Sequence, residues 1–196
     1  MNGETPKAFA QVLKNNGGRI LQISTDYVFD GFKNTPYIPL DKRNPLCVYG
    51  QSKAFAEEYI EECLSSTNQG FILRSSWLIS PSGDNFIFKM LKLLDERENL
   101  QVVSDQIGCS TSTIHLASVC WEIIRRVEMG HYCPSIMHWS DSGVASWFDI
   151  AIAISQLSKT MGLITMPAKV IPIKSSEYIT KASRPNFSLL DSSETS

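Results

Sequence analysis

Residues 19–31 decide the fold; they read Arg-Ile-Leu-Gln-Ile-Ser-Thr-Asp-Tyr-Val-Phe-Asp-Gly. The first six form a β-rich run that follows a helix stop at Gly17-Gly18, so they predict a buried strand. Residues 24–26 then place two hydroxyls and a carboxylate where that strand ends. In an open parallel sheet the ligand lies just beyond the carboxyl ends of the strands. The stretch therefore predicts both an α/β fold and the position of its site.

The rest of the chain alternates between helical and strand-like patterns. Apolar residues at three- and four-residue spacing predict helices over 5–15, 45–64, 85–94, 113–127 and 146–161. Short β-rich runs predict further strands over 70–74, 100–103, 135–139 and 169–173. This alternation is typical of an α/β fold with a largely parallel sheet.

Two helices and the C-terminus have a predicted environment. Phe9, Val12 and Leu13 fall on one face of the first helix, so we expect that face to pack. The second helix carries an acidic cluster that we expect to form a solvated face, namely Glu57, Glu58, Glu61 and Glu62. Beyond Leu190 the chain is polar, which predicts a frayed tail.

Composition excludes several classes of protein. Hydrophobic residues make up 43% and charged residues 19%, an ordinary globular balance that argues against disorder. The formal net charge of -2 leaves no broad basic surface for phosphates, so we expect no nucleic-acid partner. The apolar stretch at 147–157 is far short of the ~20 residues that span a bilayer, and no signal-peptide pattern begins the sequence. We therefore expect a cytoplasmic protein without a membrane partner.

Cysteines and histidines show no ligand spacing. The five cysteines are far apart and include no Cys-x-x-Cys pair, which argues against a disulfide framework and a zinc site. Free thiols suit a reducing cytosol. The three histidines have no metal-ligand spacing among themselves, and His115 and His138 are predicted to be structural. No metal site is predicted.

Residues 49–53 form a Tyr-x-x-x-Lys motif on a predicted helix. Residues i and i+4 share one helix face, so the phenol and the ammonium can reach the same ligand. A nearby cation favours phenolate, and we expect Lys53 to lower the pKa of Tyr49 toward a useful range. Tyr49 then becomes a proton donor to a carbonyl oxygen that Thr25 holds. Taken alone, the motif also fits a surface helix whose Tyr49 packs and whose Lys53 is solvated.

Residues 24–31 and 44–53 together resemble the extended short-chain dehydrogenase/reductases and, more narrowly, the dTDP-4-dehydrorhamnose reductases. The resemblance continues through residues 74–77, 85–86, 102–111, 138–149 and 184–191. Several ordered segments over nearly the whole chain are a far more specific signal than any one of them.

The resemblance implies an α/β fold that is the C-terminal part of a Rossmann-like doubly wound parallel sheet, with a small substrate-binding subdomain. Residues 1–75 would be the remaining part of the NAD(P)-binding domain and carry the catalytic residues. Residues 76–190 would form the mixed substrate-binding portion, and 191–196 a flexible tail.

The resemblance also implies roles for single residues. Tyr49 would donate a proton to the 4-keto oxygen, Lys53 would hold the nicotinamide ribose, and Thr25 would complete the catalytic trio. The cofactor, NADPH or NADH, would meet Ile23, Tyr49 and Lys53. The dTDP-sugar substrate would be bound by Thr25, Asp26, Trp77, Asn85 and Arg184.

Three of these residues also have a structural interpretation. Trp77 follows a strand, where tryptophan is more often core than ligand. Asn85 stands where it can cap the following helix. Arg184, before a proline, can satisfy carbonyls in a loop.

The sequence departs from the resembled family in one respect. It contains no G-x-G-x-x-G, so we expect about 90–100 residues of the Rossmann half to be missing and the chain alone to be inactive. The expected reaction is the NAD(P)H-dependent reduction of dTDP-4-dehydro-L-rhamnose to dTDP-L-rhamnose. The alternatives are a non-catalytic relative that resembles the regulatory subunit of methionine adenosyltransferase, or a reductase or epimerase of another nucleotide-sugar. A homodimer and the choice between NAD and NADP stay open.

Overall fold

Three parallel strands form the central sheet of the computed structural model, which describes residues 2–178, 180 and 182–195. They are β1 (Ile20–Thr25), β2 (Gly70–Ser75) and β7 (Ile136–Trp139), in the order β1-β2-β7. β2 is buried along its whole length because it lies between the other two strands and is covered on both faces. All three strands therefore end at the same edge of the sheet.

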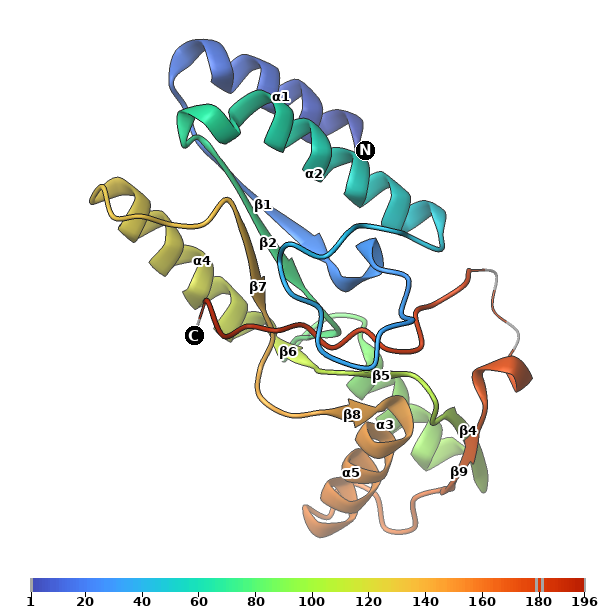
Figure 1. The fold of residues 1–196 in the computed structure, drawn as a ribbon. Helices are drawn as coiled ribbons and strands as arrows, with labels where there is room; N and C mark the ends of the chain where they lie inside the picture. The colour runs from blue at the N-terminus through green and yellow to red at the C-terminus, as the bar shows by residue number, and fades with distance from the viewer. Residues whose placement is uncertain (1, 179, 181, 196) are drawn as a thin grey trace.

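Helices cover both faces of this sheet (Figure 1). α1 (Glu4–Asn16) and α2 (Val48–Leu64) pack side by side on one face, where Ala10, Ile60, Leu64 and Ile72 form a buried cluster. α4 (Thr113–Glu128) covers the other face through a second cluster: Phe71, Leu73, Leu116, Ile123, Val127, Cys133 and Met137. The result is a three-layer α/β/α arrangement.

A second packed region lies beyond the end of the sheet (Figure 1). It contains α3 (Phe86–Glu96), α5 (Trp147–Thr160) and a separate parallel pair, β4 (Asn99–Val103) with β9 (Lys169–Ile173). Its core consists of Met90, Leu94, Leu100, Val102, Ala151, Ile154, Ile164 and Ala168.

Short elements connect the two regions. β3 (Leu78–Ile79) pairs in parallel with β6 (Thr111–Ser112), and β5 (Ile107–Gly108) pairs antiparallel with β8 (Ala145–Ser146). Three 3₁₀ turns cover Asp26–Val28, Ser65–Thr67 and Ser175–Glu177. The long predicted helices and strands are thus confirmed, together with the α/β class. The four short strands were not predicted, nor was the distribution of the strands over one three-stranded and three two-stranded sheets.

The packed face of α1 differs from the prediction. Phe9 and Val12 are 57% and 60% exposed, whereas the buried residues of this helix are Pro6 and Ala10. Small side chains on the inner face let α1 lie close against α2, and this packing outweighs the apolar stripe. The expectation was therefore wrong for Phe9 and Val12.

The acidic face of α2 is also different from the expected one. Glu58 and Glu62 are exposed, but Glu57 is fully buried and paired with Arg74 and Arg43. A buried carboxylate needs charged partners and hydrogen bonds, and both arginines come from other parts of the chain. The prediction of a solvated Glu57 was wrong.

The C-terminal residues are tied to the sheet end through residue 192. The Asp191 N–H donates to the Tyr37 carbonyl at 2.8 Å, and the Ser140 N–H donates to Ser192 Oγ at 3.2 Å. Ser196, the last residue of the predicted tail, lies outside the described residues. The domain boundaries at residues 75 and 190 stay predictions.

Two kinds of feature are absent from the described residues. No helix among them is long and apolar enough to cross a membrane. Within the same residues, no group of three or more His, Cys, Asp or Glu side chains is placed to hold a metal ion.

Candidate functional site

The sheet register brings two rows of polar residues to its carboxyl edge. Ser24 of β1 is level with Arg74 of β2, which is level with His138 of β7. One residue further along, Thr25 is level with Ser75, and Ser75 with Trp139. The structure thus puts the candidate residues at the sheet edge, as the strand-end rule predicts.

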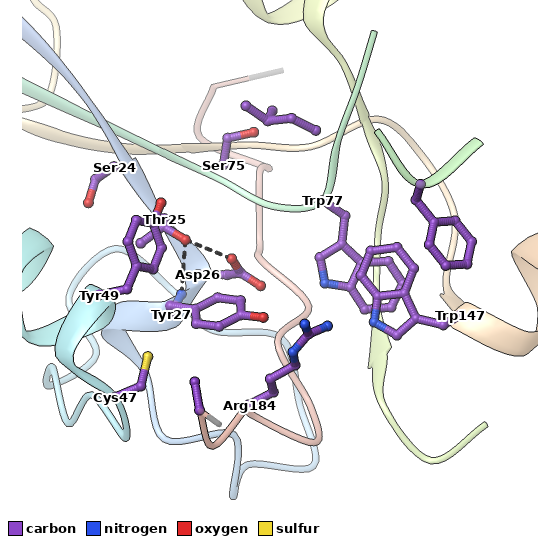
Figure 2. Close-up of a pocket in the computed structure, with 13 residues that line it drawn as sticks. Ser24, Thr25, Asp26, Tyr27, Cys47, Tyr49, Ser75, Trp77, Trp147 and Arg184 are labelled. Carbon is purple, nitrogen blue, oxygen red and sulfur yellow. Dashed lines mark hydrogen bonds between the residues drawn. The ribbon is translucent and has the colours of Figure 1, made fainter. Parts of the chain in front are cut away.

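A cavity of ≈ 510 Å³ opens at this edge (Figure 2). It lies between the end of β1, the start of α2 and the aromatic side chains of the second region. Its lining residues are Ser24, Thr25, Asp26, Tyr27, Cys47, Tyr49, Ser75, Trp77, Leu78, Phe86, Trp147, Ala182 and Arg184. Of the predicted substrate residues, the cavity is lined by Thr25, Asp26, Trp77 and Arg184. Asn85 does not line it.

Thr25 and Tyr49 form the polar wall of the cavity. The Thr25 hydroxyl donates to Asp26 Oδ1 at 3.0 Å and accepts the Tyr27 N–H at 3.2 Å. Burial raises the pKa of Tyr49, and a hydrogen bond with Thr25 opposes the rise. The expectation that Lys53 lowers the pKa of Tyr49 is not met in this structure, because desolvation outweighs every other effect on the phenol.

Lys53 lies one helical turn after Tyr49. Its Nζ donates to the Ile23 carbonyl at 3.1 Å, so the ammonium rests against the backbone near the end of β1. Burial lowers the pKa of Lys53, and the Glu57 carboxylate one turn further along opposes that shift. Ile23 therefore contacts Lys53 through its backbone carbonyl oxygen, not through its side chain.

Gly50 allows the close approach of α2 to the end of β1. A Cβ at this position would lie 2.2 Å from the Tyr27 carbonyl oxygen and 2.9 Å from Pro45 Cβ. Any side chain at residue 50 would therefore push the first turn of α2, and Tyr49 with it, away from the strand.

Asp26 is a buried carboxyl group in the cavity wall. It is only 1% exposed, and burial raises its pKa to about 6, although the Ser188 and Thr25 side chains act in the opposite direction. Among the described residues, its Oδ2 atom has no hydrogen-bond partner. A buried acceptor without a partner is rare and is satisfied when a ligand donates to it.

Aromatic rings form the wall opposite Tyr49 (Figure 2). Trp77 and Trp147 stack with ring centroids 3.9 Å apart, and Phe86 lies 4.6 Å from Trp147. Trp77 has φ 44°, a left-handed conformation that is strained for a bulky residue and often found at functional sites. Trp77 has this conformation where its indole lines the cavity.

Of the two remaining predicted residues, Arg184 lines the cavity and Asn85 does not. Arg184 reaches the cavity, where its charge lowers the pKa of Tyr27 while burial raises it more. Asn85 caps α3: its Oδ1 accepts the Ile87 N–H at 3.0 Å and the Phe88 N–H at 3.4 Å, and its Nδ2 donates to the Ser80 carbonyl at 2.9 Å. Asn85 is therefore the N-cap of α3, and its contact with the substrate stays a prediction.

A second cavity of ≈ 530 Å³ adjoins the first. Phe86, Trp147 and Arg184 line both cavities, and Lys89 and Arg97 add positive charge to the second. A long ligand with a negatively charged portion can therefore occupy both.

Seven lining residues were not predicted from the sequence: Tyr27, Cys47, Ser75, Leu78, Phe86, Trp147 and Ala182. Ser75 could have been predicted because it is the last residue of a strand, and Cys47 because it lies two residues before Tyr49. For Trp147 no local signal exists, because it reaches the cavity only through the pairing of β5 with β8.

Known proteins are similar to this chain in sequence. A dTDP-4-dehydrorhamnose reductase of Aggregatibacter actinomycetemcomitans is 38% identical over 183 residues, covering 93% of this chain and 61% of that protein. The reductase of Escherichia coli K12 is 31% identical over 191 residues, covering 97% and 63%.

Solved structures of such reductases are similar to this chain in fold. A dTDP-4-dehydrorhamnose reductase of Clostridium acetobutylicum superposes with a TM-score of 0.86 at 33% identity, covering 99% of this chain and 64% of that one. The Bacillus anthracis reductase in complex with NADP superposes with a TM-score of 0.82 at 31% identity, covering 98% and 63%.

The chain spans about three fifths of the length of these relatives. The RmlD substrate binding domain profile matches residues 1–196, the whole sequence. The chain therefore belongs to the RmlD substrate binding domain family.

Proposed function

We propose that this chain provides the substrate site and the proton-donating residues of an NAD(P)H-dependent reductase that converts dTDP-4-dehydro-L-rhamnose to dTDP-L-rhamnose. The observation that carries the proposal is the convergence of Thr25 and Tyr49 on one wall of a cavity whose other wall is aromatic. A few polar groups facing apolar rings is the usual lining of a small-molecule site.

The nucleotide part of the substrate fits the adjoining cavity. Lys89 and Arg97 lie in that cavity, and Arg184 lies where it meets the first one. Positive side chains there favour a diphosphate group, while the stacked indoles offer flat apolar surface. The sugar then lies toward Tyr49.

The proton reaches the substrate from Tyr49. As the 4-keto group is reduced, its oxygen gains negative charge and takes the proton of the Tyr49 hydroxyl. Burial raises the pKa of Tyr49, so its hydroxyl stays protonated until that charge develops. The Thr25 hydroxyl holds the phenol in place, and the unpartnered Asp26 Oδ2 accepts a hydroxyl of the sugar.

Lys53 suits the ribose of a nicotinamide cofactor. Its ammonium has three donors, and within the described residues one of them is used in the hydrogen bond to the Ile23 carbonyl. The other donors can bind ribose hydroxyls. When bound, the cofactor supplies the hydride. The sequence contains no G-x-G-x-x-G, the motif that cradles the pyrophosphate of such a cofactor.

The test compares substrates with the product of the complete gene that encodes this chain. NADPH oxidation is expected with dTDP-4-dehydro-L-rhamnose, and Tyr49→Phe is expected to lower kcat by roughly a hundredfold or more. Unchanged turnover in Tyr49→Phe would exclude the assigned proton donor. One relative is named dTDP-4-keto-6-deoxy-D-glucose reductase, so faster turnover of another dTDP-sugar would redirect the proposal to that substrate.

Binding to the chain itself gives a second test. Calorimetry with this chain is expected to show binding of dTDP-L-rhamnose and no measurable binding of NADPH. A non-catalytic relative would keep the fold but not the response to Tyr49→Phe. A homodimer and a cytoplasmic location stay predictions.

A further inference from the structure

Glu57 is a buried carboxylate that the proposed chemistry does not use. It lies on α2 one turn after Lys53 and two turns after Tyr49, and its side chain is fully buried. Burying a charge is costly unless partners compensate for it, so such a residue calls for an explanation.

Successive turns of α2 contact successive residues of β1. The Lys53 ammonium donates to the Ile23 carbonyl at 3.1 Å, and the Ser24 hydroxyl donates to Glu57 Oε1. Residues 53 and 57 share a helix face, and residues 23 and 24 are adjacent on the strand. A slip of the helix along the strand would break both contacts at once.

Tyr49 and Thr25 add the third contact of this series. Both line the same cavity, and the Thr25 side chain acts to lower the pKa of Tyr49. Thr25 directly follows Ser24, the residue that Glu57 holds. Three turns of α2, at residues 49, 53 and 57, thus lie against three neighbouring residues at the end of β1, although not in the order of the strand. Of the three contacts, the one at Glu57 is the most deeply buried.

Two arginines fix Glu57 from other parts of the chain. Arg74 of β2 donates through Nη2 to Oε2 at 2.7 Å and through Nε to both oxygens at 3.1 Å, while Arg43 Nε donates to Oε2 at 2.6 Å. Arg74 is itself held by the Pro39 carbonyl at 3.0 Å and by His138 Nε2 at 3.2 Å. The pKa of Glu57 is lowered because these partners outweigh burial, so it stays ionised and is not a proton donor.

We propose that Glu57 is the positioning residue that sets the register of α2 on β1, and thereby holds the Tyr49 hydroxyl at Thr25 and the Lys53 ammonium at the end of the strand. The proposal rests on the proposed function, because the positioned groups are the proton donor and its neighbours. Glu57 acts through Ser24 and Lys53 and does not touch the substrate.

The first experiment needs only this chain. Carbon-13 NMR of labelled tyrosine, with the Tyr49 signal assigned from Tyr49→Phe, follows the titration of Tyr49 in Ser24→Ala, Glu57→Gln and Glu58→Gln. Ser24→Ala breaks only the contact between helix and strand and leaves the arginine pairs intact, so it stays informative if Glu57→Gln does not fold. Glu58→Gln is the matched control, an exposed glutamate on the same helix.

The expected result is a higher Tyr49 pKa in Ser24→Ala and Glu57→Gln, because the opposing hydrogen bond with Thr25 is weakened. Glu58→Gln should titrate like the wild type. If Tyr49 titrates identically in all folded variants, the pair of Glu57 and Arg74 is a structural element only and the proposal fails.

The second experiment measures turnover of the complete gene product. A displacement of about 1 Å at a reacting group costs up to about a hundredfold in rate, so kcat should fall ten- to a hundredfold in Ser24→Ala while KM for the dTDP-sugar changes less than about twofold. A wild-type protein without reductase activity but with the Tyr49 shift refutes the proposed function and leaves the positioning intact. An active wild type with unchanged kcat in Ser24→Ala refutes the positioning.

Discussion

Replacing Gly50 by alanine tests how closely α2 must approach the end of β1. The new Cβ would lie 2.2 Å from the Tyr27 carbonyl oxygen, whereas ordinary van der Waals contact begins at 3.4 Å. The backbone at residue 27 or the first turn of α2 must therefore move by about 1 Å. Tyr49 precedes the substituted residue, so its hydroxyl moves away from Thr25.

The magnitudes show which measurement is sensitive. Overpacking costs about 1–3 kcal/mol, but alanine is favoured over glycine inside a helix by about 1 kcal/mol. The free energy of unfolding should then fall by no more than about 2 kcal/mol, and the protein should fold. A displacement of about 1 Å at the proton donor, by contrast, is expected to lower kcat by up to about a hundredfold.

The assay compares Gly50→Ala with Gln51→Ala, which adds the same residue type at the exposed neighbouring position. Turnover of the complete gene product should collapse in the first variant and persist in the second. Affinity for dTDP-L-rhamnose should hold in both, because the aromatic wall is untouched. If folded Gly50→Ala keeps kcat within about twofold of wild type, Tyr49 does not depend on this close approach.

Four further predictions concern the cap, the aromatic wall and two buried titratable groups. Asn85→Ala should lower the free energy of unfolding by about 1 kcal/mol, because α3 loses its N-cap, and leave dTDP affinity unchanged in calorimetry; a large loss of affinity would support a ligand role instead. Trp77→Ala should weaken binding of dTDP-L-rhamnose by about tenfold, and unchanged binding would remove Trp77 from the site. Asp26 has its pKa raised from 3.8 to about 6, so the folded state holds the extra proton and stability falls as pH rises through that window; Asp26→Asn should remove this dependence, about 3 kcal/mol in total. His138 has its pKa lowered from 6.5 to about 4, so stability is lost as pH falls from 6.5 to about 4, and His138→Gln should flatten that limb. Urea unfolding from pH 4 to 7 checks both, and parallel curves for variant and wild type would contradict the assignment.

Local patterns account for what could be predicted. Strands and helices followed from periodicity, and Thr25 followed from its place at the end of a strand. Tyr49 and Lys53 could be paired because a spacing of four residues fixes their shared helix face before any tertiary contact forms.

The errors came from contacts between distant residues. Nothing near Glu57 in sequence distinguishes it from Glu58, because its burial depends on Ser24, Arg43 and Arg74. On α1, the apolar stripe suggested a packed face, but close contact with α2 requires the small residues on the other side. Both errors arise because helix packing depends on shape as well as on hydropathy.

Two neighbouring rows of residues across the end of the sheet differ in how well their polar side chains are paired. In the row formed by Ser24, Arg74 and His138, the side chains are bonded to one another or to Glu57, and the charges are compensated. In the next row, among the described residues, Ser75 Oγ and Trp139 Nε1 are buried without hydrogen-bond partners, and so is Oδ2 of Asp26. Unsatisfied buried polar atoms are destabilising, and Ser75 and Asp26 both line the cavity, where a ligand can complete their hydrogen bonds. The first row can therefore hold the sheet edge rigid while the second stays free to bind, as the proposed positioning role of Glu57 and the proposed proton donation by Tyr49 both require.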